Sequence, residues 1–187
     1  MTAAAAHPPS GRYASAVADV ACVRCCRNFV APVAADSWRD RWLSRLRFCS
    51  FRCQVCNARF RKRRGRADCG TDLGRRQYLR LPVALPARLR FKDGSLSTAG
   101  VENLSIGGCE IRCDRTLEAG TRLTVLIAGL GQTGEVEVEV AVVYASRHSF
   151  AGLKFLGLAE LALEELGRFL YVLWIADKNM AIGGRPC

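Results

Sequence analysis

The chain has 187 residues, 50% of them apolar and 24% charged, which is the usage of an ordinary globular protein. No apolar run approaches the roughly 20 residues that a membrane-spanning helix needs, and the first residues lack the basic and apolar regions of a secretory signal. We therefore expect a cytoplasmic protein without a membrane span. The net charge of +11 is uneven: residues 1–80 carry 17 Lys and Arg against 5 Asp and Glu, whereas residues 81–187 carry 11 against 12.

Composition divides the chain into five predicted segments. Residues 1–18 are rich in Ala, Pro, Ser and Gly and are typical of a disordered leader. Residues 19–60 form a cysteine-rich module, and residues 61–73 are charged and turn-forming, as in a linker. Residues 74–176 contain a strand-rich region ending in a helix, and residues 177–187 form a tail.

Two Cys-x2-Cys pairs stand in the first segment that is expected to fold. Each two-residue loop can direct two thiolates at one ion, so the pairs predict a tetrahedral zinc site made by Cys22, Cys25, Cys53 and Cys56. In a compartment that keeps thiols reduced, clustered cysteines bind metal more often than they form disulfides. Zinc would also hold together a module that is too short for a large core. The alternatives are free buried cysteines or a ribbon that has lost its metal.

The pairing resembles the two knuckles of a zinc ribbon, and RFCSFRCQVCNARFRKRR resembles the second knuckle of small bacterial ribbons. Two positions depart from that pattern: Cys26 and Asn57 stand where Gly is expected. Asn tolerates the left-handed conformation of such a turn, whereas Cys does so less readily. Cys26 could also compete as a metal ligand.

Period-two alternation begins at residue 82 and predicts β-strands. The expected strands lie within 82–91, 101–113, 123–130, 134–145 and 149–155. In the fourth of these, the even-numbered valines from Val136 to Val142 are expected to point inward and Glu135, Glu137 and Glu139 outward. Short strands with frequent turns and no intervening helix predict a mainly β fold, a small antiparallel barrel.

Helical periodicity appears only near the end. Leu163, Leu166, Leu170 and Leu173 recur at spacings of three and four, so residues 160–174 are expected to form an amphipathic helix packed on the mouth of the barrel.

Three arginines, Arg75, Arg76 and Arg80, stand just before the first predicted strand. Gly74 and Pro82 argue against a helix here, so we expect an irregular arm. The planar guanidinium can donate two hydrogen bonds at once, and its natural partners are phosphates and the O6/N7 edge of guanine. A solvated charge cluster is the alternative.

About 25 residues further on, NLSIGG supplies polar side chains and paired glycines that let a backbone approach a ligand. Arg76-x3-Arg80 followed by Asn103-x-Ser105-x2-Gly108 resembles the two-part motif of the PilZ domain, a bacterial receptor for cyclic di-GMP. RRQYLRLPVALPARL and FAGLKF agree with it, and the resemblance covers about residues 74–176. It implies a six-stranded antiparallel barrel with a C-terminal helix. The ligand-binding residues that it implies are Arg75, Arg76, Arg80, Asn103, Ser105, Gly107 and Gly108.

An enzyme is not expected, because His7 and His148 are the only histidines and no paired carboxylates or nucleophile–base spacing accompanies them. Three interpretations remain. The first is a bacterial cyclic di-GMP receptor that relays binding through the zinc-ribbon-like module to an unidentified protein partner. The second is a zinc-ribbon regulator that binds nucleic acid through its basic N-terminal part. The third is a PilZ-like adaptor that no longer binds nucleotide.

Overall fold

The computed structural model describes residues 20–33, 38–46, 48–63, 78–130 and 134–183. The chain groups into two compact units. One comprises residues 1–53 and 58–77, and the other comprises residues 54–57 and 78–187. The predicted leader and most of the predicted linker lie outside the described residues.

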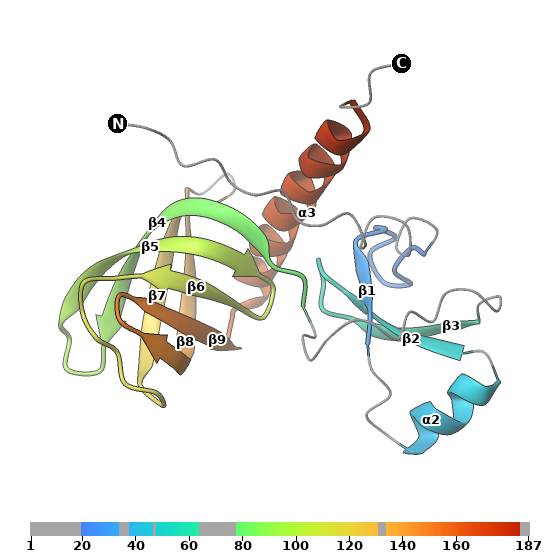
Figure 1. The fold of residues 1–187 in the computed structure, drawn as a ribbon, viewed down its shortest axis with the longest axis horizontal. Coiled ribbons are helices and arrows are strands. Elements are labelled where there is room, and N and C mark those ends of the chain that lie inside the picture. Colours follow the sequence, from blue (N-terminus) through green and yellow to red (C-terminus); the bar gives the residue numbers. More distant parts are fainter. Residues whose placement is uncertain (1–19, 34–37, 47, 64–77, 131–133, 184–187) are drawn as a thin grey trace. The chain divides into compact units, whose positions relative to one another are not determined.

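The first unit contains a small antiparallel sheet in the order β1-β2-β3 and one short helix (Figure 1). Its elements are β1 (Val30–Pro32), α2 (Trp38–Arg45), β2 (Phe48–Cys53) and β3 (Arg59–Arg63). The rings of Phe51 and Phe60 stack across β2 and β3 with centroids 5.9 Å apart, and Phe51 is fully buried. This is a minimal core, which fits a module that needs a further stabilising element. Strand β3 continues to Arg63, into the stretch expected to be linker.

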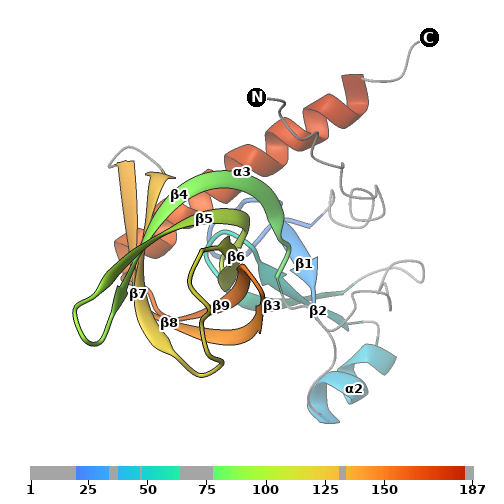
Figure 2. The same cartoon turned by 60° about the vertical axis from the view of Figure 1, so that its left-hand side comes forward.

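The second unit contains a closed barrel in the order β4-β5-β6-β9-β8-β7, with every neighbouring pair antiparallel. Figure 2 shows the strands as a ring. They are β4 (Leu81–Phe91), β5 (Leu96–Ser105), β6 (Gly108–Arg112), β7 (Arg122–Leu130), β8 (Gly134–Arg147) and β9 (Phe150–Gly157). The predicted six-stranded antiparallel barrel is confirmed.

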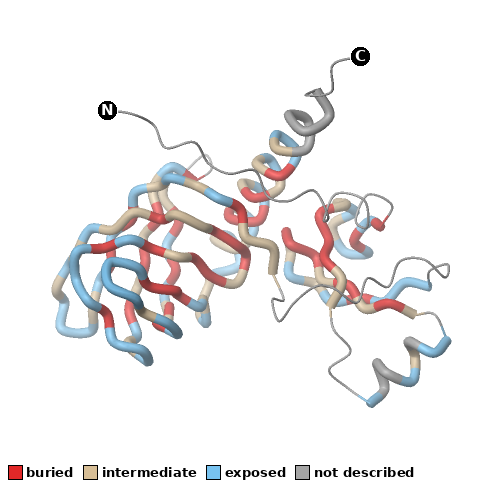
Figure 3. The backbone as a smooth tube through the Cα atoms, in the orientation of Figure 1, coloured by how far each residue is buried: buried red, intermediate tan, exposed pale blue. Residues whose placement is uncertain are grey.

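Buried and exposed residues alternate along most of the barrel strands, as predicted (Figure 3). On β4, Ala87 and Leu89 are buried inside while Arg88 and Arg90 lie outside. The two arginines form ion pairs across the surface, Arg88 with Glu135 at 2.7 Å and Arg90 with Glu137 at 2.5 Å. The glutamates of β8 therefore face outward, where the sequence pattern put them.

Strand β8 departs from the predicted alternation in its second half. Val136 and Val138 are buried as expected, but a shift in the pairing with β9 separates Val140 from Ala141. Ala141 and Val143 become the buried residues after it. The expectation that Val140 and Val142 point inward like the first two valines is therefore wrong, because an irregularity that adds one residue reverses the faces of everything beyond it.

The C-terminal helix α3 (Glu160–Gly183) packs against β4, β7 and β8. Leu166 and Leu170, at the centre of the predicted apolar stripe, are buried, together with Trp174. The helix continues past residue 176, where the barrel segment was expected to end. Within the described ranges, no helix has the length and apolar content needed to cross a bilayer.

Candidate functional site

Arg80, the described arginine of the predicted motif, lies beside the NLSIGG turn because the two occupy the paired ends of neighbouring strands. In the β4–β5 ladder Leu81 is opposite Leu104 and Pro82 is opposite Asn103. The ring of Tyr78 lies against Gly107, where a Cβ atom would be 2.4 Å from the ring. Arg80 is thus adjacent to the second half of the predicted motif, although about 25 residues separate them in the sequence.

Arg80 extends from the start of β4 to Tyr144 on β8. Its Nη2 atom donates a hydrogen bond to the Tyr144 hydroxyl at 2.6 Å, and its guanidinium carbon lies 6.0 Å from the centre of the tyrosine ring. The ring of Tyr144 covers Gly152 on β9, where an added Cβ would be 2.5 Å from it. Tyr144 remains 49% exposed, so a cation and an aromatic surface are presented together on the outside of the barrel.

A row of residues connects this pair to Asn103 across the outer face of the barrel. Asn103 pairs with Glu110, Glu110 pairs with Gly152, and Gly152 pairs with Ala145 next to Tyr144. The Asn103 amide donates from Nδ2 to a Glu110 carboxylate oxygen at 2.6 Å. The guanidinium of Arg80 therefore lies at one end of the row, and the carboxylate of Glu110 and the amide of Asn103 lie toward the other.

The remaining residues of the predicted motif shape the turn. The hydroxyl of Ser105 donates to the carbonyl of Gly108 at 2.9 Å, and Ser105 is only 3% exposed. A Cβ on Gly108 would lie 2.1 Å from the carbonyl oxygen of Leu153 on β9, so this position has no room for a side chain. The carbonyl of Gly107 accepts a hydrogen bond from the amide of Phe155 at 3.0 Å. Arg75 and Arg76 lie outside the described residues.

Sequence reasoning missed Tyr144 and Glu110. Gly152 lies within FAGLKF, but its role as a platform for an aromatic ring was not anticipated. His148 is exposed, with a φ of 48°, in the turn between β8 and β9.

The charge of Arg80 also acts on the interior of the barrel. Burial raises the pKa of the Cys109 thiol to about 12, and the nearby positive charge of Arg80 opposes that rise. Cys109 is therefore an uncharged thiol at neutral pH and serves as a small apolar residue of the core.

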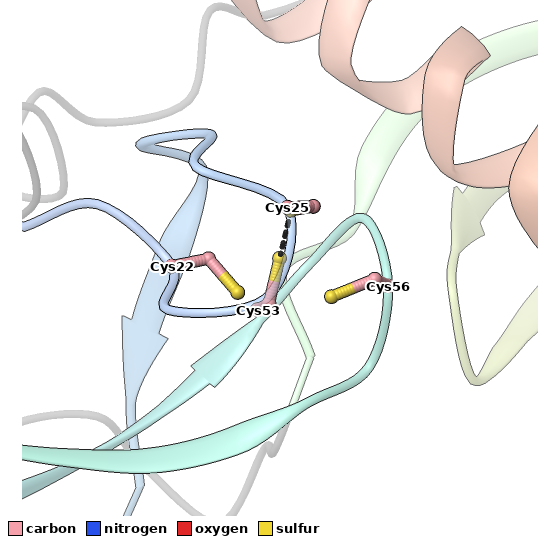
Figure 4. A group of neighbouring side chains, drawn as sticks. All are labelled: Cys22, Cys25, Cys53 and Cys56. Carbon is pink, nitrogen blue, oxygen red and sulfur yellow. Dashed lines mark hydrogen bonds between the residues drawn. The ribbon is translucent and has the colours of Figure 1, made fainter.

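The four predicted zinc ligands come together. The sulfur atoms of Cys22, Cys25, Cys53 and Cys56 all lie within 4.8 Å of one another (Figure 4). The Sγ atoms of Cys25 and Cys53 are 3.6 Å apart. Cys22 and Cys53 are buried, and Cys25 and Cys56 are partly buried. Cys26 is exposed and does not belong to the group.

The two turns that carry these cysteines are held by short-range hydrogen bonds. The amide of Cys26 donates to the carbonyl of Cys22 at 3.0 Å, and the amide of Arg24 approaches the Cys22 sulfur at 3.4 Å. In the other turn, the amide of Cys53 donates to the carbonyl of Ala58 at 2.9 Å. Cys26 and Asn57, which replace the expected glycines, have φ values of 58° and 59°. Both positions therefore adopt the left-handed conformation that the resemblance to a ribbon knuckle predicts there.

The donor set fits zinc. Four sulfurs bound at about 2.3 Å to one zinc ion would lie about 3.8 Å apart, within the spread seen here. Four thiolates suit a structural zinc site, because soft sulfur ligands favour zinc over magnesium or calcium. A closed set of protein ligands leaves no position for a reacting water, so such an ion would stabilise the module and supply no catalysis.

The fold is a small closed antiparallel β-barrel with Arg80 just before its first strand and a row of polar residues on its outer face. A family model for the PilZ domain matches residues 74–172, just over half of the chain, and the chain belongs to that family.

Solved structures are similar to this chain at low sequence identity. The structure of YcgR in complex with c-di-GMP from Escherichia coli has a TM-score of 0.50 and 17% identity, covering 80% of this chain and 76% of that one. The PilZ domain of YcgR with c-di-GMP, also from E. coli, has a TM-score of 0.47 and 18% identity over 57% of this chain and 97% of that one. MrkH from K. pneumonia in its apo state has a TM-score of 0.49 and 16% identity over 71% and 72%. No curated protein matches the chain by sequence.

Proposed function

We propose that this protein is a bacterial receptor for cyclic di-GMP that binds the dinucleotide on the outer face of its PilZ barrel. The observation that carries the proposal is the position of Arg80, which holds its guanidinium against Tyr144 beside the NLSIGG turn. Membership of the PilZ family supports it, and the similarly folded YcgR has been solved in complex with c-di-GMP.

The chemistry of the row suits this ligand. A cyclic dinucleotide of guanosine carries two phosphates and two guanines, and arginine can bind either group through paired hydrogen bonds. Arg80 would bind a guanine O6/N7 edge or a phosphate, helped by Arg75 and Arg76 of the same arm. Glu110 and Asn103 offer oxygen acceptors for guanine N–H groups, and the exposed ring of Tyr144 offers a stacking surface. Ser105, Gly107 and Gly108 would give the turn the shape that lets the ligand approach.

Isothermal titration of the whole chain with cyclic di-GMP tests the proposal. We expect binding at micromolar concentrations or tighter, at least tenfold weaker in Arg80→Ala because a charged donor is removed. Arg88→Ala is the matched control, since Arg88 is an exposed arginine on the same barrel paired with Glu135, and its affinity should not change. Cyclic di-AMP, which lacks the guanine O6 acceptor, should bind poorly. Absence of heat with the wild-type protein, or full affinity in Arg80→Ala, would contradict the proposal.

The cysteine module would hold one structural zinc ion and relay ligand binding to a protein partner. The four-thiol cluster supports the metal, and the position of the basic module directly before the arginine arm supports the relay. A partner identified by cross-linking in the presence of cyclic di-GMP, and lost in its absence, is the expected result. If the same proteins are cross-linked with and without cyclic di-GMP, the relay is contradicted.

A second candidate function, nucleic-acid binding by the first unit, is favoured by strand β3. Arg59, Arg61, Lys62 and Arg63 are all exposed on this strand of five residues. A row of cations can neutralise successive phosphates and release their counterions. Such binding weakens steeply as the salt concentration rises, because releasing counterions into a more concentrated solution gains less free energy. Fluorescence anisotropy with a labelled DNA duplex should show affinity falling at least tenfold between about 50 and 200 mM salt. Affinity that does not respond to salt would exclude this function.

A further inference from the structure

The second cysteine turn, Gln54–Asn57, belongs to the same compact unit as the barrel, although it lies between β2 and β3 in the sequence. It contains the predicted zinc ligand Cys56 and directly follows Cys53. Its contacts with the barrel unit reach the residues that precede Arg80.

Two side chains of the turn hold the arginine arm. Gln54 is 1% exposed, and its Oε1 atom accepts a hydrogen bond from the backbone amide of Leu79 at 2.9 Å. Asn57 accepts a hydrogen bond through Oδ1 from the hydroxyl of Tyr78 at 3.2 Å. Tyr78 and Leu79 are the two residues before Arg80, so the turn is hydrogen-bonded to the chain directly before Arg80.

The backbone of the turn is also fitted closely to helix α3. A Cβ atom on Gly167 would lie 2.1 Å from the carbonyl oxygen of Val55, so the helix approaches the turn where it has no side chain. This contact fixes the position of the turn on the barrel unit. A displacement of the turn would disturb both its packing against helix α3 and its two hydrogen bonds to Tyr78 and Leu79.

The shape of the turn depends on its cysteines. When Cys53 and Cys56 bind one ion, the loop between them is closed into a chelate ring, and Asn57 keeps the left-handed φ of 59° that aims its side chain at Tyr78. Without an ion, four neighbouring thiols supply no comparable constraint. The chain before Arg80 would then become ordered only when the nucleotide binds, and the entropy lost in ordering it would weaken the affinity for the nucleotide.

We propose that Gln54 and Asn57 are positioning residues for the nucleotide site, and that zinc bound at the four cysteines raises the affinity for cyclic di-GMP by preorganising Tyr78, Leu79 and Arg80. The inference rests on the proposed function and on zinc as the metal of the cluster. Because coupling between two ligands is reciprocal, cyclic di-GMP must raise the affinity for zinc by the same factor.

The first experiment leaves the metal in place. Gln54→Met keeps the size of the buried side chain but removes its acceptor, and Asn57→Gly keeps the left-handed turn but removes its side chain. In zinc-loaded full-length protein we expect Gln54→Met to weaken cyclic di-GMP binding about tenfold, with zinc still at one atom per chain. Asn57→Gly should weaken it about threefold, and Asn57→Asp, which retains the acceptor, should restore wild-type affinity. Combining Asn57→Gly with Tyr78→Phe should add nothing further, because both remove one hydrogen bond.

The second experiment measures the coupling itself. Zinc affinity is determined by competition with a chromogenic chelator, with and without saturating cyclic di-GMP, and the nucleotide is expected to raise it about tenfold. The same titration on Arg80→Ala, in which the nucleotide site is damaged, should show no such rise. This readout does not require the metal-free protein to bind nucleotide, so it remains decisive if the module unfolds without zinc.

The outcomes separate the two proposals. If the wild-type protein binds cyclic di-GMP while Gln54→Met and Asn57→Gly bind it equally well and the nucleotide leaves zinc affinity unchanged, the inference is overturned and the proposed function stands. If the wild-type zinc-loaded protein does not bind the nucleotide, both are overturned. Protein purified under reducing conditions that contains no zinc and takes up none also overturns the inference.

Discussion

Arg80 donates a hydrogen bond to the hydroxyl of Tyr144, 64 residues away in the sequence, at 2.6 Å. The tyrosine ring in turn lies against Gly152, the one kind of residue that leaves it room. The contact holds a cation on the outer surface of the barrel before any ligand arrives, and an arginine held in this way loses less side-chain entropy on binding.

This relationship predicts that Tyr144 contributes to nucleotide affinity. Tyr144→Phe keeps the ring and removes only the hydroxyl, so the dissociation constant for cyclic di-GMP should rise about threefold, the effect of one exposed hydrogen bond. Tyr144→Ala also removes the aromatic surface, and the rise should be tenfold or more. Calorimetric titration of both variants checks this. Equal affinities for Tyr144→Ala and the wild type would mean that the ring takes no part in binding.

Tyr144 could not be predicted from the sequence, for a reason that lies in β8. Val136 and Val138 point inward, and a regular strand would carry the same inward face to residue 144. The pairing shift between Val140 and Ala141 puts Ala141 and Val143 inside and so moves Tyr144 to the outside. Nothing in AVVYAS marks such irregularities, because apolar residues on both sides of the shift satisfy either alternation.

The features that were predicted depend on local patterns. Most strands follow alternation and turn residues, although β5 begins at Leu96 and not within the expected 101–113. The four cysteines follow from two short spacings, since each Cys-x2-Cys loop brings its own two sulfurs together. The row from Asn103 through Glu110 to Gly152 depends on how β5, β6 and β9 align. That alignment is determined by the closure of the whole barrel, so no single segment of the sequence predicts it.

Gly108 is predicted to be essential for the stability of the barrel. A methyl group there would meet the carbonyl oxygen of Leu153 at 2.1 Å, so β6 and β9 would have to separate. Gly108→Ala should lower the free energy of unfolding by about 2–4 kcal/mol, measured by urea denaturation. Gly100→Ala is the matched control: a methyl group on Gly100, which lies on β5, would have no atom within 4 Å, and its cost should stay within about 0.5 kcal/mol. Similar losses in both variants would contradict this interpretation of the β6–β9 contact.

The metal cluster predicts that its four cysteines are needed for zinc binding and that the neighbouring Cys26 is not. Elemental analysis of protein purified under reducing conditions should find one zinc atom per chain. Cys53→Ser should lose it, because a buried sulfur ligand is removed. Cys26→Ser should retain it, because Cys26 is exposed and lies outside the group. Loss of zinc in Cys26→Ser would assign that cysteine to the metal.

Cys26 should also be a position where the protein can be stabilised. Its φ of 58° is in the left-handed region, which costs a residue with a Cβ about 1 kcal/mol relative to glycine. Cys26→Gly should therefore raise the free energy of unfolding of the zinc-loaded protein by about 0.5–1 kcal/mol. Asn57→Gly changes the equivalent residue of the second turn and should gain less, because Asn tolerates this conformation better than Cys and its side chain bonds Tyr78. A destabilised Cys26→Gly would show that the thiol makes a contact worth more than the strain.

The buried thiol of Cys109 predicts how stability depends on pH above neutrality. Burial raises its pKa in the folded protein to about 12, against about 8.5 in an unfolded chain. The contribution of the neutral thiol is complete below about pH 8.5 and is lost as the pH rises toward 12, because the unfolded state releases its proton first. Between pH 8 and 10 the free energy of unfolding should fall by about 2 kcal/mol more in the wild type than in Cys109→Ala, as measured by urea denaturation at each pH. The zinc ligands and the other titrating groups are common to both proteins, so their effects cancel in the difference. Parallel pH profiles would mean that the thiol ionises at its ordinary pKa and that water reaches the inner face of β6.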